Sequence, residues 1–201
     1  MARVAEPSDT SGRDYAERLE RLAGARWKRW LDVQAPYRWN LRRLALGRTL
    51  DVGCGIGRNL AHLPPGSAGI DANPWSVAAA RRRGLAAFEP DAFRASRFAA
   101  ERFDALLFAH VLEHLAPAGA EALVAEHLAF LRPGGRVVLI APQEAGFRSD
   151  PTHAAFLDFI ALSALLARLG CELERAYSFP LPRALGRLFP HNEFVVVGRR
   201  P

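Results

Sequence analysis

Short apolar runs alternate with helical stretches along the chain from residue 49 onward. Seven runs have the length of strands, and they span residues 48–52, 68–71, 86–88, 103–109, 136–141, 172–178 and 193–199. Stretches with helical spacing separate the early runs, at residues 59–63, 74–83 and 118–131. This alternation predicts an α/β fold, in which right-handed crossovers connect parallel strands and the sheet is buried on both faces.

The last two apolar runs are connected differently from the others. A proline-rich loop joins them over residues 179–192 and has no room for a long crossover helix. We therefore expect these two strands to pair antiparallel. A further helix is predicted over 156–169, ended by Gly170.

The first 48 residues have a different character. Apolar positions recur at helical spacing with arginines between them, and Pro36 is expected to end or kink this helix. Residues 1–48 hold 11 basic and 6 acidic side chains, whereas residues 49–201 hold 16 and 15. The sequence thus divides into an N-terminal helical arm or lid, 1–48, and a main domain, 49–201. The basic arm is either a solvated amphipathic helix or a docking surface for nucleic acid.

Length and composition exclude several classes of protein. A chain of 201 residues that is 50% hydrophobic is long enough for one domain with its own core. No apolar run approaches the roughly 20 residues of a membrane-spanning helix, so we expect no membrane association. The polar start has no signal-peptide core. With only Cys54 and Cys171, a disulfide framework is excluded, and a reducing cytoplasm fits best.

A glycine-rich turn follows the first predicted strand. Its glycines are Gly53, Gly55 and Gly57, and Asp51 stands two residues before the first of them. Such a turn lets the backbone approach a ligand closely. The spacing G-x-G-x-G differs from the G-x-G-x-x-G of nicotinamide-dinucleotide sites. The carboxylate also disfavours a pyrophosphate and suits a ligand with an amine or sulfonium.

Two further aspartates follow the next two strands. Asp71 comes about 20 residues after the glycine turn, where an acid can accept hydrogen bonds from both ribose hydroxyls. Asp91 follows the third strand, where an acid can accept from an exocyclic amine. Together with Asp51, three carboxylates stand at corresponding strand ends, where open α/β sheets bind ligands.

On these residues the sequence resembles the class I S-adenosylmethionine-dependent methyltransferases. The resemblance runs from about residue 49 to residue 200 and is carried by 50–57, 69–71, 91–92, 103–115 and 131–140. It implies a Rossmann-like, doubly wound seven-stranded sheet, mostly parallel with the last strand antiparallel. It also implies S-adenosylmethionine as cofactor. The segment His110-Val111-Leu112-Glu113-His114 is similar to the corresponding loop in small-molecule methyltransferases of ubiquinone and methionine biosynthesis.

The resemblance also implies a set of cofactor-binding residues. Those in the main domain are Asp51, Gly53, Cys54, Gly55, Gly57, Asp71, Ala72, Asp91, Ala92, Ala109 and His110. The candidates for the methionine end are Trp30, Gln34, Tyr37 and Arg38.

Residues 110–114 also match H-x-x-E-H, a zinc-protease signature. Two histidines four apart can share a metal when they lie on one helix. Here a strand precedes the motif and Pro117 leaves room for about one helical turn, whereas a zinc protease needs a longer helix and a third ligand. We therefore expect no metal.

Methyl transfer from a sulfonium requires in-line positioning and removal of a proton from an acceptor that carries one. The preferred general base is His153, with Asp150 holding its ring, and His110 is the second catalytic candidate. Gln143, Arg183 and His191 are candidates for an acceptor pocket.

The predicted function is methyl transfer to a small-molecule acceptor, with oxygen as the expected atom. The loop after the fourth strand reads Ala109-His110-Val111-Leu112 and lacks the Asn/Asp-Pro-Pro-aromatic motif of base and glutamine N-methylation. The alternatives are an RNA or protein methyltransferase that docks through the basic arm, and an S-adenosylmethionine-binding module without chemistry. Nucleic acid is a possible but not favoured partner, and the sequence leaves the oligomeric state open.

Overall fold

The computed structural model describes residues 34–201, which form a seven-stranded sheet in the order β3-β2-β1-β4-β5-β7-β6. Its strands are β1 Thr49–Val52, β2 Ala68–Ile70, β3 Ala87–Phe88, β4 Phe103–Ala109, β5 Leu131–Pro142, β6 Glu172–Phe179 and β7 Glu193–Arg199. The first five strands pair in parallel. β7 is antiparallel to both β5 and β6. The predicted fold, with an antiparallel last strand, is confirmed.

Six α-helices and five short 3₁₀ turns connect the strands of this part of the chain. The α-helices are α3 Ala35–Leu44, α4 Pro74–Arg82, α5 Pro90–Arg94, α6 Pro117–His127, α7 Glu144–Arg148 and α8 Phe159–Arg168. The 3₁₀ turns are η1 Leu60–His62, η2 Arg97–Ala100, η3 Leu112–His114, η4 Leu128–Phe130 and η5 Arg183–Arg187. None of the helices within 34–201 is long and apolar enough to cross a membrane.

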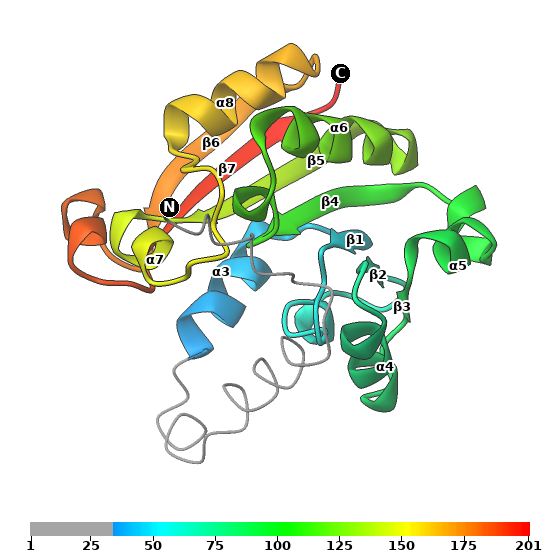
Figure 1. The fold of residues 1–201 in the computed structure, drawn as a ribbon. Coiled ribbons are helices and arrows are strands. Elements are labelled where there is room, and N and C mark those ends of the chain that lie inside the picture. The colour runs from blue at the N-terminus through cyan, green and yellow to red at the C-terminus, as the bar shows by residue number, and fades with distance from the viewer. Residues whose placement is uncertain (1–33) are drawn as a thin grey trace, which may run out of the picture.

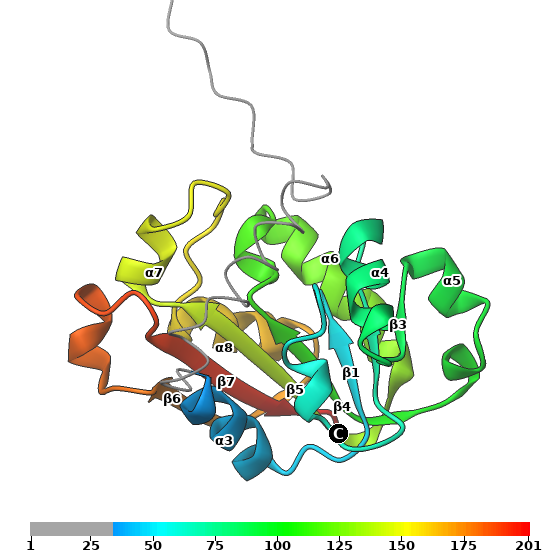
Figure 2. The ribbon, with the colours of Figure 1, turned by 90° about the horizontal axis from the view of Figure 1, so that it is seen from below.

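The central strands are buried on both faces. Along β4, Leu106 and Phe108 belong to the core cluster that includes residues of α6 and α8, whereas Leu107 and Ala109 belong to the cluster with α3. Successive side chains of a strand point to opposite faces, so one apolar run serves both cores. Figure 1 shows α6 and α8 on one side of the sheet and α3 on the other. In the turned view of Figure 2, β4, β5 and β7 lie side by side.

Local sequence signals explain where several elements begin and end. Asn73 caps α4 by accepting hydrogen bonds from the backbone of residues 75 and 76, and Pro74 occupies the first turn. Asp158 caps α8 in the same way, so this helix begins at Phe159 rather than at 156. Gly170, with φ +73°, follows its end.

The structure places Pro36 in the first turn of α3, where a proline loses no helical hydrogen bond. The helix that Pro36 was expected to end lies outside the described residues. The fifth strand begins earlier than the predicted 136, because the segment 133–135 is also part of β5. Backbone hydrogen bonds between this segment and Arg200 hold it extended (Gly134 N to Arg200 O, 3.0 Å, and Arg200 N to Gly135 O, 2.8 Å).

The predicted boundary at residue 49 coincides with the first strand, but α3 packs directly on the sheet. Its Leu41 and Leu44 are buried in the cluster that also contains Val138 and Val195. The remaining predictions for the arm, which concern Trp30 and the helical spacing before residue 34, lie outside the described residues.

Candidate active site

The carboxyl ends of β1, β2, β4 and β5 meet at one edge of the sheet. Most of the predicted site residues lie in the segments that follow these strands, namely 53–57, 71–73, 110–114 and 143–148. Open α/β sheets bind their ligands at this edge. The sheet therefore brings these four segments together.

The glycine turn has a backbone that side chains disfavour. Gly53, Gly55 and Gly57 have φ of +77°, +53° and +78°. A Cβ atom built on Gly53 would lie 2.6 Å from the Cβ atom of Val111. The glycine turn after β1 and the turn after β4 are thus in direct contact.

Asp71 holds the glycine turn in place. Its Oδ2 accepts a hydrogen bond from the backbone N–H of Gly55 at 2.7 Å, and its Oδ1 accepts from the N–H of Asn73 at 2.8 Å. Burial raises the pKa of Asp71, while these two N–H groups work in the opposite direction. Each carboxylate oxygen has a second lone pair, so the predicted ribose contact remains chemically open.

Asp51 is a buried carboxylate with unmet hydrogen-bonding capacity. It is 1% exposed, and neither of its oxygens has a hydrogen-bond partner in the described structure. Burial, together with the carboxylate of Asp71, raises its pKa to about 7. An unpaired buried carboxylate is unfavourable, so an ammonium or N–H donor of a ligand would stabilise it. The site therefore fits the amino group of S-adenosylmethionine.

The other predicted cofactor residues vary in exposure. Cys54 and Ala109 are buried, and Ala72 and Ala92 are exposed. Asp91 lies at the start of α5, where its exposed side chain pairs with Arg94 at 2.8 Å. An adenine contact by Asp91 would have to compete with this surface ion pair.

His110 sits between two carboxylates. Its Nε2 lies 2.7 Å from Oε1 of Glu193, and its Nδ1 lies 3.3 Å from Oε1 of Glu113. Desolvation lowers the pKa of His110, but the two carboxylates outweigh it and raise the pKa to about 10. The ring is thus protonated at neutral pH and cannot serve as a base there. Its backbone has φ +58°, a strained conformation for a residue with a side chain.

The start of α3 reaches the same edge of the sheet. The Tyr37 hydroxyl donates to the backbone carbonyl of His191 at 2.6 Å. Burial and the carboxylate of Glu193 raise the pKa of Tyr37, and Arg58 opposes this shift. Gln34 and Arg38 flank this tyrosine in sequence and are half-buried. Of the methionine-end candidates within the described residues, Tyr37 therefore lies near Glu193 and the loop before β7.

Two of the predicted acceptor-binding residues already have partners within the protein. Gln143 is fully buried, and its amide binds Ser178, Asn192 and the backbone of Glu193 at 2.8–3.0 Å. Arg183 forms a two-point ion pair with Glu144 and lies over a phenylalanine ring. These contacts order the segments after β5 and before β7, where the acceptor pocket was predicted.

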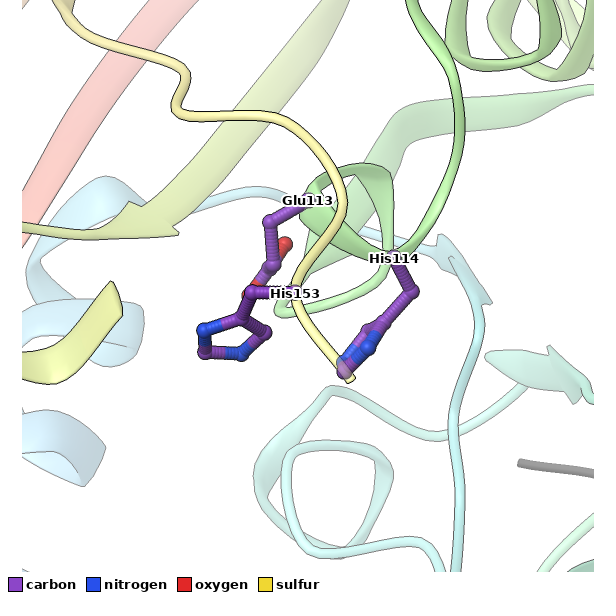
Figure 3. A group of neighbouring side chains, drawn as sticks. All are labelled: Glu113, His114 and His153. Carbon is purple, nitrogen blue, oxygen red and sulfur yellow. The ribbon is translucent and has the colours of Figure 1, made fainter. Parts of the chain in front are cut away.

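His153 lies beside two residues of the H-x-x-E-H motif. Ligand atoms of Glu113, His114 and His153 all lie within 4.8 Å of one another. Figure 3 shows Glu113 and His114 on the turn after β4 and His153 on the loop that passes over it. The sequence alone did not link these residues, although the motif itself marked two of them.

The ring of His153 is oriented differently from the prediction. Its Nδ1 donates to the backbone carbonyl of Phe147 at 2.8 Å, while Asp150 accepts hydrogen bonds from the backbone N–H and the hydroxyl of Thr152. A short aspartate side chain readily bonds the backbone two residues on, so Asp150 organises its own turn. Glu193 and Thr152 are site residues that the sequence analysis missed, because no local motif marks them.

Residues 49–135 match the family model of a methyltransferase domain. No curated protein matches the sequence. The solved structures that the chain resembles include a SAM-dependent methyltransferase from Archaeoglobus fulgidus, with 18% identity and a TM-score of 0.64 over 82% of this chain and 93% of that one.

Two further similar structures contain S-adenosylhomocysteine. Magnesium protoporphyrin IX methyltransferase from Synechocystis has a TM-score of 0.68 and 14% identity over 96% of this chain and 97% of that one. The N-methyltransferase NodS from Bradyrhizobium japonicum has a TM-score of 0.63 and 20% identity over 92% of this chain and 98% of that one. At these identities the likeness establishes the fold.

Proposed function

We propose that this chain, with its methyltransferase-domain match over residues 49–135 and its seven-stranded sheet, is a class I S-adenosylmethionine-dependent methyltransferase that methylates a small-molecule acceptor at oxygen. The observation that carries the proposal is the pairing, at one sheet edge, of two features. One is the unpartnered, buried carboxylate of Asp51 beside the glycine turn. The other is the histidine pair His114 and His153 on the adjoining turn and loop.

We assign the cofactor to the glycine-turn side of this edge. Asp51 attracts the cofactor's amino group, Asp71 accepts from the ribose hydroxyls, and the backbone of Gly53 and Gly55 allows close approach. The other contacts proposed for the cofactor are Cys54, Gly57, Ala72, Asp91, Ala92, Ala109 and His110, with Tyr37 and Arg38 at the methionine end. When bound, S-adenosylmethionine supplies a methyl group on a sulfonium, so the acceptor forms its new bond as the carbon–sulfur bond breaks and the electron pair stays on sulfur.

The protein's own chemical contribution is to position the acceptor and remove its proton. His153 donates through Nδ1 to the carbonyl of Phe147, so in its neutral form Nε2 carries a lone pair. That atom is the proposed base for an acceptor hydroxyl. His110, held protonated between Glu113 and Glu193, supplies a positive charge rather than a base.

An acceptor pocket is proposed on the side of β5 and β7. The segment after β5 and the loop before β7 are joined by the ion pair of Arg183 with Glu144 and by the buried Gln143 network. His191, in the same loop, is held through its carbonyl by Tyr37. This wall is built from short segments, which suits a small acceptor.

The proposed location of the protein is the cytoplasm. The thiols of Cys54 and Cys171 are free and buried, which is compatible with a reducing compartment.

Calorimetric titration with S-adenosylmethionine, S-adenosylhomocysteine and NADH tests the cofactor. We expect micromolar binding of both sulfur nucleotides, loss of affinity in Asp71→Ala and no binding of NADH. Glu121→Gln, in an exposed ion pair with Arg168, is the control and should bind normally. Failure of both sulfur nucleotides to bind would refute the proposed function.

Labelled methyl transfer to a panel of hydroxylated and amine compounds, alongside RNA and protein substrates, tests the acceptor. The expected result is label in a hydroxylated small molecule. Label only in RNA or protein, with strongly salt-dependent binding, would favour the alternative in which the basic arm docks a polymer. Tight cofactor binding with no product on any acceptor would favour a binding module without chemistry.

A further inference from the structure

We propose that Glu113, His114 and His153 form a binding site for a divalent transition-metal ion, of the zinc type. The role of the metal in methyl transfer rests on the proposed function. The existence of the site rests only on the geometry of the three side chains. Ligand atoms of the three side chains lie within 4.8 Å of one another. Two imidazoles and one carboxylate are a common ligand set for zinc and neighbouring metals.

Both imidazoles are held in the tautomer that binds metal through Nε2. The backbone carbonyl of Phe147 accepts from Nδ1 of His153 at 2.8 Å. Nδ1 of His114 lies 2.9 Å from the hydroxyl oxygen of Thr152, and that hydroxyl itself donates to Asp150 at 2.8 Å. Because its hydrogen is used there, the hydroxyl oxygen accepts from Nδ1 of His114. Metal-binding histidines show this arrangement, with the second nitrogen donating to an oxygen.

The buried carboxylate of Glu113 is a second, independent observation that points to a bound cation. Its side chain is 0% exposed, and neither carboxylate oxygen has a hydrogen-bond partner in the described structure. Nδ1 of His110 lies 3.3 Å from Oε1 of Glu113. Burial of an unsatisfied carboxylate is unfavourable. A divalent ion between Glu113 and the two imidazoles would satisfy it.

The frame that carries the three ligands is tied together by backbone hydrogen bonds. The carbonyl of Glu113 accepts from the N–H groups of Ala154 at 2.7 Å and Ala155 at 3.1 Å. The loop that carries His153 is therefore fastened to the turn that carries the other two ligands. In a tetrahedral site with bonds of about 2.1 Å, ligand atoms are about 3.4 Å apart. From the present spacing of at most 4.8 Å, metal binding requires ligand atoms to approach one another by up to about 1.4 Å.

Three protein ligands leave a coordination position open, as in catalytic zinc sites. An acceptor hydroxyl bound there has a lowered pKa and releases its proton to water. Its oxygen then forms the bond to the methyl carbon as the carbon–sulfur bond breaks, and the electron pair remains on sulfur. In the metal-bound form Nε2 of His153 is a ligand, and the metal replaces its action as a base.

The experiment is a titration of chelator-treated full-length protein with Co²⁺, followed by visible absorption, and then displacement by Zn²⁺ followed by calorimetry. We expect one Co²⁺ per chain with the absorption bands of a low-coordinate nitrogen–oxygen site. Glu113→Gln, His114→Gln and His153→Gln should each weaken binding at least about tenfold. His62→Gln, a histidine outside the cluster, should bind as the wild type does.

A further variant tests the site without removing any of its ligands, in case the ligand variants fail to fold. Thr152→Val keeps all three ligands and removes the hydroxyl behind His114, so it should weaken Co²⁺ binding about tenfold. Circular dichroism verifies that each variant is folded. Absence of Co²⁺ bands, or an affinity that the three ligand variants leave unchanged, would overturn the proposal. S-adenosylmethionine binding by the chelator-treated protein separates the two proposals, because it tests the proposed function without metal.

Discussion

Oδ2 of Asp71 accepts a hydrogen bond from the backbone N–H of Gly55 at 2.7 Å. The residue that follows β2 therefore fixes the turn that follows β1. Its other oxygen binds the N–H of Asn73, the residue that caps α4. One carboxylate thus connects the glycine turn, a strand end and a helix start.

We expect Asp71→Asn to reduce both stability and cofactor affinity. The amide places an NH₂ group opposite one of two backbone N–H donors, which leaves a donor unsatisfied and costs about 1–3 kcal/mol in the free energy of unfolding. Urea denaturation and calorimetry with S-adenosylmethionine measure the two effects. Asp158→Asn is the matched control, because asparagine caps α8 as well as aspartate does. Equal stability of the two variants would contradict the assigned role of Asp71.

Gly53→Ala should disrupt the contact between the two turns. Gly53 has φ +77° and would place a Cβ atom 2.6 Å from Val111, whereas Gly84 has φ +76° and nothing within 4 Å. Gly84→Ala therefore carries the backbone strain alone, about 1–2 kcal/mol, and Gly53→Ala carries strain plus overlap. Thermal denaturation of both variants measures the difference. Similar losses of stability in the two variants would mean that the side chain of Val111 moves aside without lowering the free energy of unfolding further.

The pKa of Asp51 predicts a dependence of stability on pH. Because its pKa is about 7 in the folded protein against 3.8 ordinarily, the folded state binds a proton more tightly than the unfolded state. The free energy of unfolding should therefore fall as pH rises from about 4 to about 7, by an amount on the order of 4 kcal/mol. Asp51→Asn should flatten this part of the profile, as urea denaturation across pH will show. A profile unchanged by the substitution would assign the dependence to another group.

Cofactor affinity should change with pH in the opposite sense. Asp51 is ionised in the free protein only above about pH 7, and the ionised form attracts the cofactor's ammonium group. Affinity for S-adenosylmethionine should therefore rise between pH 5.5 and about 7.5, and Asp51→Asn should bind weakly at every pH. Calorimetry in buffers of matched ionic strength measures this. An affinity that is flat across this range in the wild type would exclude the Asp51–amine contact.

His153→Gln should lower turnover by about 10²-fold while cofactor affinity stays nearly constant. The side chain lies on the loop over the turn after β4, on the proposed acceptor side, and its ring is tilted against that of His114 with ring centroids 4.9 Å apart. Steady-state kinetics with the identified acceptor and calorimetry with S-adenosylhomocysteine check the two parts. The control is His62→Gln, which should retain full turnover. Wild-type turnover by the His153 variant would remove its catalytic role.

Much of the fold was predictable from local patterns in the sequence. Apolar runs alternating with helical spacing specified the parallel strands, and a loop too short for a crossover specified the antiparallel last strand. The glycine turn was recognisable because positive φ requires particular residues at particular positions. Asn73 and Pro74 marked the start of α4 for the same reason: helix ends have local hydrogen-bonding needs that a few residue types meet.

The sequence by itself therefore determined the order of the strands, the glycine turn and the start of α4, because each depends on the conformation of a few neighbouring residues. Only the tertiary structure decided which distant side chains meet. It placed His153 against Glu113 and His114, left Asp51 without a hydrogen-bond partner among residues 34–201, enclosed Gln143 in a buried network and placed Asp91 at the surface. Such contacts depend on the path of connecting loops and on burial, and neither is encoded in the spacing of residues along the chain.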